Sequence, residues 1–133
     1  SYLALHKGYL WITKRTVIIK IDIKTGESKT IRVANLHDLR GIIIDKSGTI
    51  YVADSSQKGI FKMRQQHEDS EWIPEPLFDV AEAKFKSLSA IAMDRKGNIY
   101  AIDRHCVRFV RRPLAIPWDL ERLLWIGKIK NEA

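Results

Sequence analysis

Four aspartates recur at repeating positions, and two of them are carboxylates that could bind a metal ion. The four are Asp45, Asp54, Asp94 and Asp103. Asp54 and Asp103 could line a central channel as ligands, because carboxylate oxygens bind hard divalent cations. Such aspartates also accept the backbone N–H groups of their own turns. Matching units supply the same residue type, whereas one metal site needs different ligands from different units. We therefore favour turn capping, and we expect no metal and no cofactor.

Basic residues form the second group that could do chemistry. The candidates for partner or nucleic-acid binding are Lys14, Arg15, Arg104, Arg108, Arg111 and Arg112. If they converge, they could grip phosphate groups or an acidic protein segment. The alternative is a solvated surface of a basic protein. Nucleic-acid binding through this group predicts a steep loss of affinity with added salt, and a similar loss on Arg111→Ala with Arg112→Ala.

Nucleophilic catalysis is not favoured by the sequence. Cys106 lies beside His105, but neighbouring residues of a strand point to opposite faces and cannot readily form a hydrogen bond. We expect Cys106 to be a buried or half-buried thiol. The sequence has no Gly-x-Ser-x-Gly elbow, Walker loop or dinucleotide-binding motif, and its histidines show no ligand spacing. A non-catalytic protein is therefore the favoured interpretation.

An internal repeat positions these side chains. Residues 39–54 and 88–103 align without a gap at one offset of 49 residues. The repeat landmarks are Asp45, Gly48, Tyr51 and Asp54 in the first copy, and Asp94, Gly97, Tyr100 and Asp103 in the second. In each copy a short β-rich run meets an Asp-x-x-Gly turn, where glycine supplies the positive φ of a tight hairpin. Each copy therefore predicts one β-hairpin.

Further strands extend each predicted hairpin. Residues 59–63 and 106–110 are expected as third strands, and residues 75–79 as an edge-like fourth strand that tolerates Pro76. The N-terminal part fits the same scheme less well, with strands at 8–12, 16–22 and 29–33. It lacks the turn aspartate and has Lys14 at the position of Asp54, so we interpret it as a degenerate or truncated unit.

The aromatic residue of each unit occupies one repeat position. Trp11, Tyr51 and Tyr100 could offer a stacking platform for nucleic-acid bases. Their regular spacing within inner strands favours core packing between units instead, with the polar ring atoms reaching a partner.

The Asp-x-x-Gly-x-hydrophobic-Tyr-x-x-Asp core of these units resembles NHL repeats over roughly residues 1–112. This resemblance implies an all-β fold, a partial β-propeller of about three four-stranded antiparallel blades over 1–114, divided at approximately 1–36, 37–84 and 85–114. It also implies a non-catalytic module that binds another macromolecule, protein first and RNA as an alternative. Related propellers include lactonase-like and lyase-like enzymes, so a fragment of such an enzyme is the second interpretation. About three blades leave open sheet edges, which predicts additional blades or self-association to close the ring.

The period changes after the repeats, in residues 115–133. Leu120, Leu123 and Leu124 have the spacing of one helix face, so we expect a short helix and tail here. Its expected role is to pack on the last blade or cover an exposed edge. Trp118 and Trp125 would be binding anchors in the alternative interpretation.

The composition favours one cellular location and one class of partner. The chain has 133 residues, a formal net charge of +7 and one cysteine, and it lacks an Asn-x-Ser/Thr sequon. A lone cysteine cannot form an intramolecular disulfide, which favours an intracellular, cytoplasmic protein. No apolar stretch approaches the ~20 residues that span a bilayer, so no membrane association is expected. The charge favours an acidic partner.

Overall fold

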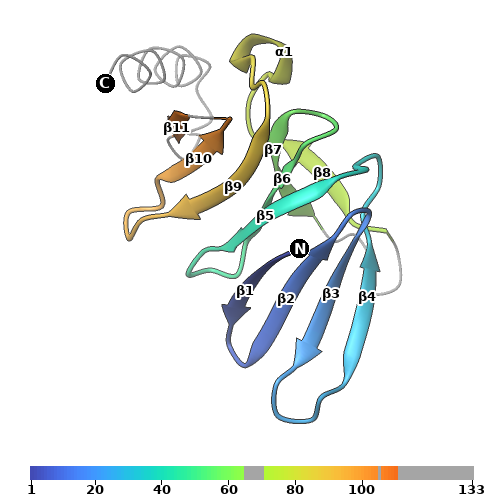
Figure 1. Cartoon of the computed structure of the whole chain (residues 1–133). Helices are drawn as coiled ribbons and strands as arrows, with labels where there is room; N and C mark the ends of the chain where they lie inside the picture. The colour runs from blue at the N-terminus through green and yellow to red at the C-terminus, as the bar shows by residue number, and fades with distance from the viewer. Residues whose placement is uncertain (65–70, 105, 111–133) are drawn as a thin grey trace.

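The structure is a computed structural model that describes residues 1–64, 71–104 and 106–110. These residues form three antiparallel sheets and one short helix (Figure 1). The first sheet contains β1 (Tyr2–His6), β2 (Tyr9–Lys14), β3 (Val17–Asp22) and β4 (Ser28–Arg32). The second sheet contains β5 (Leu39–Ile44), β6 (Ile50–Asp54), β7 (Gly59–Arg64) and β8 (Ile73–Pro76). The third sheet contains β9 (Leu88–Met93), β10 (Ile99–Asp103) and β11 (Cys106–Val110). The expectation of an all-β chain is confirmed for these residues.

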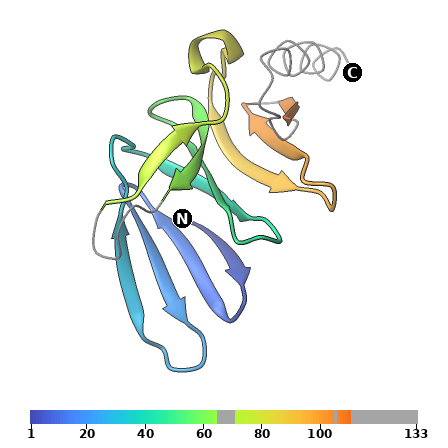
Figure 2. The same cartoon turned by 180° about the vertical axis from the view of Figure 1, so that it is seen from behind.

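The second sheet lies between the other two and is buried on both faces (Figure 2). Successive residues of a strand point to opposite faces. Ile50 and Val52 accordingly pack in one apolar cluster with the first sheet, whereas Tyr51 and Ala53 pack in a second cluster with the third sheet. Every residue of β6 is buried as a result. The two predicted hairpins therefore belong to separate sheets stacked face to face.

The first strands of the sheets lie side by side, with β5 between β1 and β9 (Figure 1). The approach of β5 to β9 is close enough to require glycine. A Cβ atom added at Gly41 would lie 2.7 Å from the backbone nitrogen of Ile91, shorter than a real Cβ contact. The sheets therefore meet backbone to backbone along their first strands.

The N-terminal unit is not truncated, which corrects one prediction. It is a complete four-stranded sheet, since β1 precedes the three strands that the sequence suggested. Residues 2–6 gave no sign of a strand because they precede the Gly8 turn and have no counterpart among the repeat landmarks. The strand is confirmed by its antiparallel register, in which Leu3 faces Ile12 and Leu5 faces Leu10.

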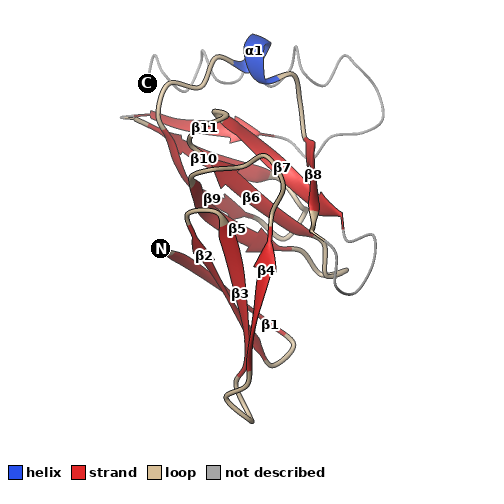
Figure 3. Ribbon diagram, turned by 90° about the vertical axis from the view of Figure 1, so that its right-hand side faces the viewer, coloured by secondary structure: helices blue, strands red, loops and turns tan. Residues whose placement is uncertain are grey.

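The fourth strand of the second unit is also displaced from its predicted place. The prediction of 75–79 was wrong in its bounds, because β8 ends at Pro76 and Asp79 is the N-cap of a short helix, α1 (Val80–Ala83). The Asp79 side chain accepts the N–H groups of Ala81 and Glu82, and this capping turns the chain away from the sheet (Figure 3). The predicted helix within 115–133 lies outside the described residues. Among those described, no helix is long and apolar enough to cross a membrane.

Candidate functional site

The first pair of repeated aspartates closes the hairpin turns. Asp45 Oδ1 accepts the N–H groups of Ser47 and Thr49 at 3.0 and 2.9 Å. Asp94 Oδ1 accepts those of Lys96 and Asn98, both at 2.9 Å. The glycines that follow, Gly48 and Gly97, have φ angles of 89° and 86°. The turn chemistry expected from the sequence is therefore present twice in the same form.

The second pair of aspartates fastens each hairpin to the connection before it. The buried Asp54 accepts the N–H group of Asp38 at 2.8 Å, and Asp103 accepts that of Ser87 at 2.7 Å. Asp38 and Ser87 are themselves one repeat apart, so the same bond recurs in both sheets. We call this recurring bond the loop staple. Because both carboxylates are engaged in loop staples, their repetition has a structural explanation.

Three aromatic rings at one repeat position have different surroundings. Trp11 and Tyr51 are buried, and Trp11 packs on Trp72 with ring centroids 5.9 Å apart. Tyr100 is half-buried against Phe109, with its hydroxyl 3.3 Å from Asp94 Oδ2. Core packing between sheets therefore describes the first two rings, and only Tyr100 remains partly open to solvent.

The predicted basic residues of the third sheet separate in space. Arg108 is 6% exposed and donates to the Ala83 carbonyl oxygen at 2.8 Å, with Asp103 at 3.7 Å and the Phe85 ring beneath it. Burial lowers the pKa of Arg108, and the Asp103 carboxylate acts in the opposite direction. Arg104 lies in the exposed turn after β10, with a φ of 60°. Arg108 therefore binds within the protein, whereas Arg104 faces solvent. Arg111 and Arg112 lie outside the described residues.

Lys14 and Arg15 line a hollow between the first two sheets. Its volume is about 580 Å³. Lys14 ends β2, and Arg15 occupies the turn into β3 with a φ of 45°. Two hydrogen bonds join the first two sheets beside this hollow. The Leu39 N–H group donates to the Arg15 carbonyl oxygen at 2.7 Å, and the hydroxyl of buried Thr13 donates to the Arg40 carbonyl oxygen at 2.7 Å. The chain around Lys14 and Arg15 is thus held against the start of β5, and both side chains are exposed.

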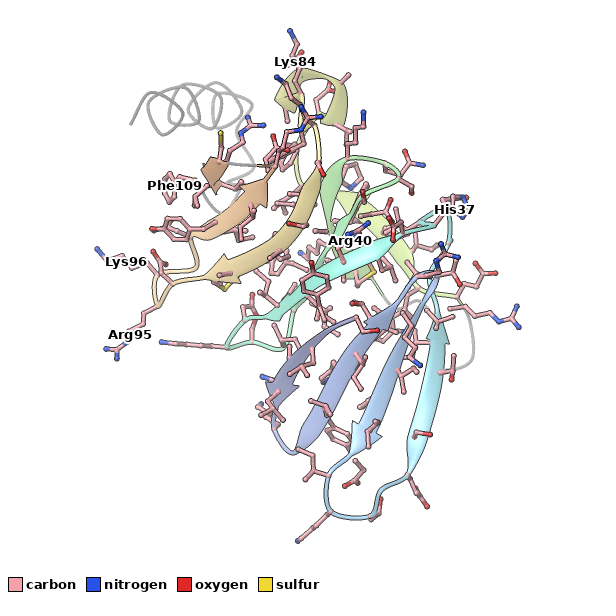
Figure 4. All side chains as sticks on the ribbon, in the orientation of Figure 1. His37, Arg40, Lys84, Arg95, Lys96 and Phe109 are labelled. Atoms are coloured by element: carbon pink, nitrogen blue, oxygen red, sulfur yellow. The ribbon has the colours of Figure 1, made fainter. Side chains whose placement is uncertain are left out.

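Arg40 adds a third cation to this hollow, which we call the basic hollow. Its guanidinium lies 3.0 Å from the Asp38 carboxylate, which raises the pKa of Arg40 above its ordinary value. Figure 4 shows Arg40 on β5 near the middle of the molecule. The basic hollow is lined by three cationic side chains and one anionic side chain, so two positive side-chain charges are not offset within it. Sequence inspection missed Arg40 because it is a single cation, just before the β-rich run of the first repeat copy, and belongs to no basic run.

A second hollow, of about 340 Å³, lies between the two Asp-x-x-Gly turns. Three cations line it, Lys46, Arg95 and Lys96, together with Asp45 and Asp94. Arg95 and Lys96 point away from the β9–β10 turn, at the opposite end of that sheet from Lys84 (Figure 4). With two carboxylates among its lining residues, this hollow has a smaller positive excess than the basic hollow.

The described residues contain no group of three or more His, Cys, Asp and Glu side chains that could hold a metal ion. Cys106 is a half-buried free thiol, as expected, and its neighbour His105 lies outside the described residues. A scan against models of known protein families and a search of curated proteins found no match.

Proposed function

We propose that this chain is part of an NHL-like β-propeller. Three features support the proposal: the sheets stack face to face, their first strands lie side by side, and the loop staple recurs at one offset. A β-propeller arranges its sheets in this way, each covering the next around a central axis. The described sheets contain four, four and three strands.

The function we propose is non-catalytic binding of an acidic protein segment at the basic hollow. The observation that carries this proposal is the uneven charge of the hollow, where Lys14, Arg15 and Arg40 outnumber Asp38. Lys14 and Arg15 are exposed, so a partner can reach their charged groups without a change in the fold. Half-buried Tyr2 also lines the hollow and adds an apolar ring, which suits a peptide that alternates carboxylates with apolar residues.

The test is titration of a fluorescein-labelled, glutamate-rich peptide into the chain. Lys14→Gln with Arg15→Gln should weaken binding on the order of 10-fold, because two charge-assisted contacts are lost. The control is Lys24→Gln with Lys84→Gln, which removes the same net charge from exposed positions outside both hollows. It should leave the affinity within about twofold of the wild type.

Two results would contradict the proposal. Equal losses in both double variants would show that net charge, rather than the basic hollow, governs binding. A single-stranded RNA of the same charge that binds more tightly than the peptide, and is weakened by the Lys14 and Arg15 changes, would assign the hollow to nucleic acid instead.

A further inference from the structure

The outer face of the first sheet is apolar over β1, β2 and β3, is polar over β4, and has no sheet against it within the described structure. β1, β2 and β3 pair in register and place six aliphatic side chains on this face: Leu3, Leu5, Leu10, Ile12, Ile19 and Ile21. Leu3 and Leu5 are 64% and 66% exposed. A contiguous apolar face of this kind is characteristic of an interaction surface rather than of a solvated sheet. We call it the leading face.

The repeat shows what covers the leading face in the other sheets. Counting back 40 residues, as Gly8 matches Gly48, Leu10 corresponds to Ile50 and Ile12 to Val52. Ile50 and Val52 are 5% and 0% exposed, because the first sheet covers them. In the third sheet the same positions are Ile99 and Ala101, which the second sheet covers. At both interfaces, therefore, a preceding sheet occupies this position.

The third sheet carries the matching surface at the other end of the molecule. Tyr100 is the counterpart of Tyr51, whose face of the second sheet covers the third. The side of the third sheet that contains Tyr100 also contains Phe109, Ile102 and Val107, of which the last two are 43% and 54% exposed. We call it the trailing face. Both internal interfaces join a trailing face to a leading face, and the described chain exposes one of each.

We propose that the leading face of one copy docks on the trailing face of a second copy. The contact is head-to-tail and would repeat the two interfaces already present inside the chain (Figure 1). If the rotation closes after two copies, each copy makes the contact twice and the apolar faces of both are covered. This inference concerns assembly and does not depend on which macromolecule occupies the basic hollow.

Sedimentation velocity of the chain over a concentration series tests the proposal. The wild type should form dimers, and Leu5→Lys or Ile102→Lys should each weaken dimerisation on the order of 30-fold, because each places a charge in a desolvated contact. Leu3→Lys gives a second variant of the leading face. Ile73→Lys is the matched control, since Ile73 is an exposed aliphatic residue on β8 and belongs to neither face. Far-UV circular dichroism checks that each variant is folded.

Mixing the two variants separates this arrangement from a symmetric one. A Leu5→Lys copy retains its trailing face, and an Ile102→Lys copy retains its leading face, so the mixture should recover a heterodimer through one intact contact. A wild type that stays monomeric at all concentrations would overturn the proposal. So would dimers that survive Leu5→Lys and Leu3→Lys, or a mixture in which no heterodimer forms.

Discussion

Replacing Asp54 by alanine removes the loop staple of the second sheet. The Asp54 carboxylate is fully buried and accepts three hydrogen bonds. They come from the Asp38 N–H group at 2.8 Å, the Gln57 N–H group at 2.8 Å and the Ser56 hydroxyl at 2.5 Å. Alanine leaves two backbone N–H groups without this acceptor. One lies in the connection before β5, and the other lies in the connection between β6 and β7.

The expected loss in the free energy of unfolding follows from the number of buried donors that lose their acceptor. A hydrogen bond to a charged group contributes about 1.5–3 kcal/mol, and an unsatisfied buried donor costs a similar amount. Ser56 and Gln57 are exposed, so water reaches them more readily than it reaches half-buried Asp38. We therefore expect Asp54→Ala to lower the free energy of unfolding by about 3 kcal/mol.

Urea unfolding, followed by tryptophan fluorescence and circular dichroism, measures this loss. Asp22→Ala is the matched control, because Asp22 caps an exposed turn through the Lys24 and Thr25 N–H groups and should cost less than about 1 kcal/mol. A loss for Asp54→Ala that equals the loss for Asp22→Ala would refute the reasoning, because the staple would then contribute no more than a surface turn.

Three further changes test other parts of the fold. Gly41→Ala should destabilise the chain by about 1–3 kcal/mol in urea, because the new methyl group meets the Ile91 backbone at 2.7 Å. Trp72→Ala should cost about 3–5 kcal/mol in the same assay, since it removes the ring that packs on Trp11 between the first two sheets. Partial burial acts to raise the pKa of Asp94, but hydrogen bonds from Asn98, Lys96 and Tyr100 together lower it below its ordinary value. The folded pKa is thus below the unfolded one, so this stabilisation is present above about pH 4 and is lost as the pH falls. Asp94→Asn should therefore flatten the acid limb of melting temperature against pH, and an unchanged acid limb would contradict this.

Local chemistry explains which elements could be predicted from the sequence. The hairpins around Gly48 and Gly97 were predictable, because an aspartate, a glycine with positive φ and flanking β-branched residues all favour the same turn. The bounds of β8 were not, because the Asp79 N-cap competes with strand continuation over residues 77–79. Strand β1 could not be predicted, because no turn aspartate marks it in the sequence and its pairing with β2 is visible only in the structure.

Tertiary contacts determine which of the predicted basic residues lie together and which are buried. Arg108 and Arg104 are four residues apart in one basic run, yet the strand alternation of β11 turns Arg108 inward to the Ala83 carbonyl oxygen. Its partner Asp103 is a repeat landmark, but nothing in the spacing shows that the two side chains meet. Lys14 and Arg15 were identified from sequence, whereas Arg40 joins them only because β5 crosses beside the end of β2.

The last position of the second strand differs between the sheets. In the second and third sheets this position is Asp54 or Asp103, a buried carboxylate committed to a loop staple. In the first sheet it is Lys14, which is exposed and lines the basic hollow. A cation could not replace either aspartate, because it would meet backbone N–H donors instead of accepting from them. The first sheet is therefore the one sheet of the described structure in which this position carries a charge that faces solvent.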